Sequence, residues 1–204
     1  MTAKMRTERG ERRCRDIIEA AAEVFLDRGF AGASVDAIVE RAGGSKETLY
    51  NHFGNKAGLL KAIIELNTET LFARLHMPAD DTTIAVFLAD IGQRYLDAVL
   101  SPRGLAIYRL VLAESGRMPE LGDQFYRVGP EALVQGLALH LRAWAAAGTI
   151  TLGDAHKTAA AFYALLRGEL QLRALFNPAR APNTEEIATH LCFAVTSFLA
   201  VLRA

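Results

Sequence analysis

The sequence predicts an all-α fold, and three observations lead to this prediction. Apolar residues recur at the 3.6-residue spacing of an amphipathic helix along most of the 204 residues. Ser, Asn and Pro stand where helices would begin, and Gly stands where they would end. The longest alternating pattern that is typical of a strand covers only residues 149–152. A 51% apolar chain with zero net charge is folded rather than disordered.

The first part of the chain contains short helices separated by glycine breaks. Gly29 ends the first helix, because glycine accepts the left-handed backbone of a helix C-terminus. Ser34 and Ser45 are the predicted N-caps of the second and third helices, and the pair Gly43 and Gly44 separates these two. The predicted helices cover residues 12–28, 35–42 and 46–53, and a fourth runs from Lys56 to a point before Pro78.

The rest of the chain predicts longer helices. Pro102, Pro119 and Pro130 each stand where the first residue of a helix is expected. Asn183 and Glu186 have the spacing of a capping box, which marks the start of the last helix. The predicted helices cover residues 82–100, 102–116, 119–127, 130–147, 154–175 and 184–203.

Charge and cysteine usage exclude several classes of protein. Residues 1–15 hold 6 Lys and Arg against 2 Asp and Glu, and no apolar run follows this basic arm, so it is not a secretory signal. Cys14 and Cys192 lie too far apart in sequence for a CxxC zinc or redox motif, which is consistent with a reducing cytoplasm. Residues 187–202 lack charge but are too short and too polar to span a membrane. No catalytic constellation, cofactor motif or metal-ligand spacing is visible, so neither an enzyme, a cofactor nor a metal is expected.

Residues 30–56 carry the functional signal. Two short helices joined by a glycine turn are typical of a helix-turn-helix, whose second helix enters the major groove of DNA. Leu49 and Phe53 are four residues apart and face inward, which leaves the polar residues between them for solvent or DNA. Spacing alone fits a solvated helical hairpin without a role in DNA binding equally well.

The sequence FAGASVDAIVERAGGSKETLYNHFGNKAGLLKAII resembles the DNA-binding domain of TetR/AcrR-type transcriptional regulators. Two positions depart from the family pattern. Gly44 stands where a small apolar residue is usual, from which we expect a looser turn. Glu47 replaces a small residue, and it either accepts a hydrogen bond from cytosine N4 or repels phosphate. The matching residues are Gly29, Phe30, Ser34, Val35, Ile38, Val39, Ala42, Gly43, Ser45, Leu49, Tyr50, His52, Phe53, Lys56 and Leu59. Residues 95–130 resemble one branch of the family.

The resemblance implies a helix-turn-helix DNA-binding domain with a basic arm over residues 1–55, and a larger helical-bundle ligand-binding and dimerisation domain over residues 56–204. It implies a cytoplasmic repressor that binds a palindromic double-stranded DNA operator as a homodimer and is released by a small-molecule effector. The implied DNA-binding residues are Ser34, Ser45, Lys46, Thr48, Tyr50, Asn51, His52 and Lys56, with Arg6, Arg9, Arg12 and Arg13 of the arm on phosphates.

The C-terminal part supplies the remaining candidates. Polar and aromatic residues on its apolar helices are the expected ligand contacts: Tyr95, Tyr108, Arg109, His140, Trp144, Tyr163 and Arg167. An apolar stripe on the last helix is expected at the dimer interface or, alternatively, in the core: Ile187, Leu191, Val195, Phe198 and Leu202. The rival function is a helical small-molecule-binding or interaction module without operator binding, which Gly44 and Glu47 favour.

Overall fold

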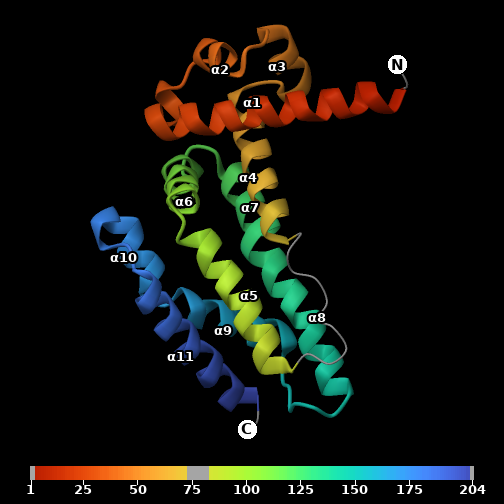
Figure 1. The fold of residues 1–204 in the computed structure, drawn as a ribbon, viewed down its shortest axis with the longest axis vertical. Helices are drawn as coiled ribbons and strands as arrows, with labels where there is room; N and C mark the ends of the chain where they lie inside the picture. Colours follow the sequence, from red (N-terminus) through yellow and green to blue (C-terminus); the bar gives the residue numbers. More distant parts are fainter. Residues whose placement is uncertain (1–2, 73–82, 203–204) are drawn as a thin grey trace. The chain divides into compact units, whose positions relative to one another are not determined.

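A computed structural model describes the backbone of residues 3–72 and 83–202 and the side chains of residues 10–66 and 83–202. The described residues form helices joined by turns and include no strand, which confirms the all-α prediction (Figure 1). The chain divides into two compact units. Unit 1 comprises Met1–Thr68 and Ala106–Phe125, and unit 2 comprises Glu69–Leu105 and Tyr126–Ala204. The expected domain boundary after residue 55 falls inside unit 1.

The helices of unit 1 begin and end close to where the sequence predicts. Their bounds are α1 Ala3–Gly32, α2 Val35–Ala42, α3 Lys46–Phe53 and α4 Lys56–Phe72. Gly29 interrupts α1 with a φ of 68°, and one further turn follows it. Ser34 and Ser45 cap α2 and α3, because each hydroxyl accepts a hydrogen bond from a backbone N–H three residues later, at 3.1 Å.

The interior of unit 1 is apolar and draws on all four of these helices. Its fully buried side chains include Phe25, Ile38, Leu49, Leu59, Leu60, Ile63 and Ile64. Parts of two further helices, α6 (Pro102–Ser115) and α7 (Pro119–Tyr126), belong to the same unit. Gln124 of α7 donates a hydrogen bond of 2.7 Å to the carboxylate of Glu65 on α4. This polar contact fastens the Ala106–Phe125 segment to α4.

Unit 2 is a helical bundle around one apolar core. Its helices are α5 Ile84–Val99, α8 Ala132–Ala146, α9 Ala155–Arg167, α10 Leu170–Phe176 and α11 Thr184–Leu202. Helices α5 and α11 run side by side (Figure 1). Gly92 permits this approach, because a Cβ there would lie 2.6 Å from Cδ1 of Leu191. The rings of Phe162 and Phe198, 4.9 Å apart, join α9 to α11 in the core.

Two predicted helix boundaries in this part are wrong. Pro130 does not begin a helix; it lies in a π-helical turn, Arg127–Glu131, through which α7 continues into α8. Proline has no N–H to donate, and the irregular hydrogen bonding of a π turn tolerates this. The single helix predicted over residues 154–175 is broken at Gly168, where φ is 45°.

The break at Gly168 has a tertiary cause. His190 of α11 places its ring where a Cβ of residue 168 would lie. Its Nε2 donates to the carbonyl oxygens of Leu165 and Leu166, at 2.9 and 3.0 Å. The imidazole therefore binds the C-terminal end of α9, a partner that the periodicity of residues 154–175 does not reveal.

The stripe assigned to the dimer interface lies largely inside unit 2. Val195, Phe198 and Leu202 are buried in the core of this chain, and Ile187 and Leu191 pack against the same core. Of the two alternatives, dimer interface or core, the structure favours the core for the three buried residues, because their apolar faces are already covered. By length and composition alone α11 is also apolar enough to span a membrane, although only 22% of it is buried inside the structure.

Candidate nucleic-acid interface

Helix α3 presents one apolar and one polar face. Leu49 is fully buried and Phe53 is half-buried, so these two side chains anchor the helix to unit 1. Glu47 and Asn51 lie on the opposite face, are exposed, and have Tyr50, 48% exposed, beside them. A helix anchored in this way presents carboxylate, amide and phenol groups to the solvent.

Several polar side chains of α3 already have partners within unit 1. The ammonium of Lys46 pairs with the carboxylate of Asp36 on α2, and this hydrogen bond raises the pKa of Lys46. The hydroxyls of Ser45 and Thr48 are 2.9 Å apart. His52 is exposed, and its ring lies 6.0 Å from that of Phe53. Of the implied DNA-binding residues on α3, Asn51 lies at the centre of the outward face, while Lys46 and His52 lie at its edges.

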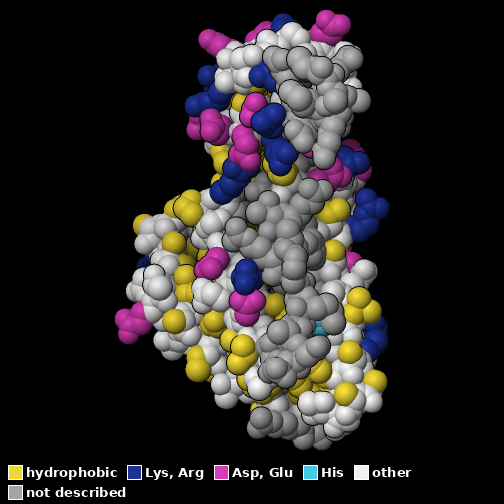
Figure 2. Space-filling model, turned by 45° about the vertical axis from the view of Figure 1, so that its right-hand side comes forward, with side chains coloured by type: hydrophobic (Ala, Val, Ile, Leu, Met, Phe, Trp, Pro, Cys, Tyr) yellow, Lys and Arg dark blue, Asp and Glu magenta, His cyan; other side chains and the backbone are white. Residues whose placement is uncertain are grey.

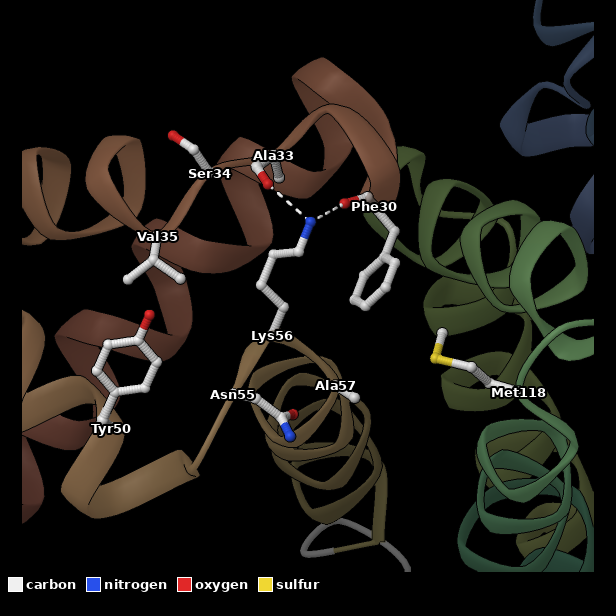
Figure 3. A pocket seen from close by; sticks show the side chains of 9 residues that line it. All are labelled: Phe30, Ala33, Ser34, Val35, Tyr50, Asn55, Lys56, Ala57 and Met118. Atoms are coloured by element: carbon white, nitrogen blue, oxygen red, sulfur yellow. Dashed lines mark hydrogen bonds between the residues drawn. The ribbon is translucent and has the colours of Figure 1, made fainter.

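An open hollow of about 510 Å³ lies beside α3 (Figure 3). The N-terminal ends of α2 and α4 both border it, and Tyr50 closes one side. Backbone N–H groups at helix N-termini carry partial positive charge and attract anions. The lining residues are Phe30, Ala33, Ser34, Val35, Tyr50, Asn55, Lys56, Ala57 and Met118. Most of this lining is apolar, so the groups that could attract an anion are the N–H groups of the two helix ends rather than the walls of the hollow.

The ammonium of Lys56 has hydrogen-bond partners within unit 1. Its Nζ donates hydrogen bonds to the carbonyl oxygens of Phe30 and Ala33, both at 2.8 Å, and lies 3.5 Å from that of Ala31 (Figure 3). It also lies 4.9 Å from the centre of the Phe30 ring. That Lys56 contacts DNA stays a prediction; in this structure its ammonium binds the carbonyl groups at the end of α1, where the helix dipole favours a cation.

In the described part of the basic arm, Arg13 also has partners within the chain. The Arg13 guanidinium donates to the carbonyls of Ala42 and Gly43, and Arg12 is exposed. Arg6 and Arg9 lie outside the residues whose side chains are described. The looser turn expected from Gly44 is wrong, because the Gly43 and Gly44 N–H groups donate back to the last turn of α2 and close its C-terminus.

The predicted ligand contacts do not form one cluster. Tyr95 and Tyr163 are buried together in unit 2 with ring centres 5.1 Å apart, and burial raises the pKa of Tyr163. His140 and Trp144 form a second group with Phe87 in the same unit.

The other three predicted contacts lie elsewhere. Tyr108 and Arg109 belong to unit 1, where the Tyr108 ring meets that of Phe125 at 5.6 Å. Arg167 is half-buried at the end of α9. Within the residues described, no group of three His, Cys, Asp or Glu side chains is placed to hold a metal ion.

Comparison with known proteins identifies both parts of the chain. Residues 17–63 match the family described as bacterial regulatory proteins, tetR family. Residues 87–204 match the C-terminal domain of AefR-like transcriptional repressors. The activator FasR of Mycolicibacterium smegmatis is 41% identical over 78 residues, which are 38% of this chain and 35% of FasR. The regulator UidR of Escherichia coli is 31% identical over 121 residues, which are 59% of this chain and 60% of UidR.

Solved structures agree over nearly the whole chain. The flavonoid-responsive regulator FrrA is 33% identical, with a TM-score of 0.78 over 94% of this chain and 97% of FrrA. A structure from Mesorhizobium loti, assigned to the TetR family, gives a TM-score of 0.86 at 26% identity, covering 96% of this chain and 99% of its own.

Proposed function

Since the chain belongs to the TetR family of transcriptional regulators, we propose that it is a cytoplasmic repressor that binds a palindromic operator as a homodimer and leaves it when a small aromatic molecule binds. The observation that carries the DNA-binding half is the exposed polar face of α3, opposite the fully buried Leu49.

The outward face of α3 has the chemistry of base readout. An asparagine side chain can donate a hydrogen bond to adenine N7 and accept one from adenine N6. A glutamate carboxylate can accept a hydrogen bond from cytosine N4. Asn51 and Glu47 are the exposed side chains that supply these groups. We assign base contacts to these two residues, with Glu47 added to the set predicted from sequence, and phosphate contacts to Ser34 and Tyr50 at the hollow.

The proposed dimer uses the uncovered faces of α10 and α11. Phe193 and Val201 of α11 are 61% and 63% exposed, and Leu172 and Phe176 of α10 are 57% and 83% exposed. Exposed large apolar side chains on these two helices indicate a surface that another molecule covers. Two copies joined through this face would form a four-helix arrangement, which is common for such contacts.

An aromatic effector is proposed on two grounds. The interior of unit 2 contains the Tyr95–Tyr163 pair and the Phe87, His140 and Trp144 group, and ring faces of this kind stack with planar ligands. The structural neighbour FrrA is flavonoid-responsive by its name. Trp144 is the one tryptophan of the sequence, so flavonoid titration should quench its fluorescence, and Trp144→Phe is the control without the reporter.

A mobility-shift assay tests the proposal that the chain binds an operator. The wild-type chain is expected to retard the DNA upstream of its own gene at low salt and to release it as salt rises, because phosphate contacts displace counterions. A scrambled fragment of equal length should bind more weakly, and Asn51→Ala should remove that difference. Equal affinity for both fragments would instead support the module without operator binding, which the carboxylate of Glu47 favours through repulsion of phosphate.

A further inference from the structure

The turn between α2 and α3 contains a side chain that the sequence pattern does not place there. Arg13 of α1 reaches across 29 residues of sequence and donates from Nη1 to the carbonyl of Ala42, at 2.8 Å. Its Nη2 donates to the carbonyl of Gly43. The guanidinium therefore binds two consecutive carbonyls at the C-terminal end of α2, where the helix dipole favours positive charge.

Gly44 makes this position available. A Cβ on residue 44 would overlap Nη2 of Arg13 and lie 3.2 Å from its Cζ. The φ of Gly44 is not positive, so the glycine is not required by its own backbone conformation. A residue with a Cβ at this position would require the guanidinium of Arg13 to move. The absence of a side chain at residue 44, where the family pattern has a small apolar residue, thus leaves room for the guanidinium of Arg13.

We propose that Arg13 is a positioning residue for α3, which it holds in place by binding the turn through the space that Gly44 leaves. Ser45, the N-cap of α3, follows Gly44 directly, so a fixed turn fixes the start of α3 against α1. Arg41 adds a second tie between α2 and α1, with Nε 2.8 Å from the carboxylate of Glu23. The proposal rests on the proposed function and deepens it.

Only an arginine fits this role. Its planar fork carries separate N–H groups on two nitrogens, whereas lysine offers a single point charge. Arg13→Lys keeps the positive charge but loses the paired N–H donors of the guanidinium. The substitution therefore distinguishes a positioning role from simple attraction to phosphate. Gly44→Ala keeps Arg13 but removes its space.

The first experiment is a thermal-unfolding cycle on the full chain with Arg13→Ala, Gly44→Ala and the double variant. Gly44→Ala alone should lower Tm by about 2–4 °C, because it displaces a partly exposed guanidinium whose hydrogen bonds contribute about 1 kcal/mol. In the Arg13→Ala background the same change should leave Tm unchanged or raise it by about 1–3 °C, since alanine restricts the unfolded chain. Equal shifts in both backgrounds would overturn the pairing.

The second experiment measures affinity for the upstream DNA against salt concentration. Positioning predicts that Arg13→Lys and Arg13→Ala weaken specific binding alike, by about tenfold, because both lose the paired hydrogen bonds. The slope of log K against log salt should stay unchanged in both. A direct phosphate contact predicts instead that Arg13→Ala lowers the slope by about one and that Arg13→Lys restores affinity.

Arg12→Ala is the matched control, because Arg12 is the exposed neighbour with the same charge. As a phosphate contact it should lower the salt slope without changing Tm. If the wild-type chain binds no DNA at all, the proposed function fails, and the role of Arg13 in DNA binding fails with it. The unfolding cycle still decides in that case whether Arg13 and Gly44 hold the turn.

Discussion

Replacing Lys56 with methionine removes an ammonium from the end of α1 while keeping most of the side chain that packs on Phe30. The structure gives this ammonium two hydrogen bonds of 2.8 Å to backbone carbonyls and a ring contact at 4.9 Å. Hydrogen bonds from a charged donor contribute about 1.5–3 kcal/mol each, and an exposed cation–π contact contributes roughly 0.5–1 kcal/mol. Water compensates for part of this stabilising free energy in the variant, because Lys56 is only half-buried. The expected net loss is about 2 kcal/mol.

A loss of this size should lower Tm by about 4–8 °C in a chain of 204 residues. Circular dichroism at the helical band measures it. Lys61→Met on the exposed side of the same helix α4 is the control, and it should change Tm by less than about 1 °C. If both variants unfold at the wild-type temperature while Lys56→Met alone reduces the salt slope of DNA binding, Lys56 contacts phosphate and the reasoning from its carbonyl partners is refuted.

Two further outcomes follow from the contacts in unit 2. Phe193→Glu should convert a dimer into monomers in sedimentation experiments, whereas Leu139→Glu, at a similarly exposed site on α8, should leave the assembly intact; monomers in both variants or in neither would contradict the proposed face. The Asn183 N–H and the Arg173 guanidinium hold the pKa of Glu186 below its ordinary value. Folding thus favours the ionised form, so Glu186 stabilises above the unfolded pKa of about 4.3, and this is lost as pH falls through the folded value. The Tm difference between wild type and Glu186→Gln should therefore shrink below pH 4, and a difference that grows there would refute the capping role.

Local chemistry was sufficient to predict the elements that form the interface. The Ser34 and Ser45 caps, the glycine breaks and the apolar spacing of Leu49 and Phe53 act over three or four residues, and the structure confirms each of them. The capping box at Asn183 is confirmed for the same reason: its two hydrogen bonds join residues three apart. Signals of this range are fully contained in the sequence.

Partners that are distant in sequence account for the contacts that the sequence did not predict. Lys56 and Arg13 look like solvated cations, yet their acceptors are carbonyls 23 to 30 residues away. Backbone carbonyls leave no mark on the sequence, so little in it could indicate these bonds. The glycine at position 44 was the one available clue, because a missing side chain can mean that another side chain occupies the space. The break at Gly168 depends in the same way on His190 of a different helix.

The account depends most on the outward face of α3, and a footprint on the DNA upstream of the gene tests it most directly. Two protected half-sites related by a dyad are expected, with centres about 34–36 Å apart or a multiple of that spacing, since each copy of α3 enters a major groove on one face of the duplex. Asn51→Ala should abolish protection while its Tm stays within about 1 °C of wild type. Protection that survives in Asn51→Ala, or a footprint without paired half-sites, would contradict the claim that α3 reads the operator.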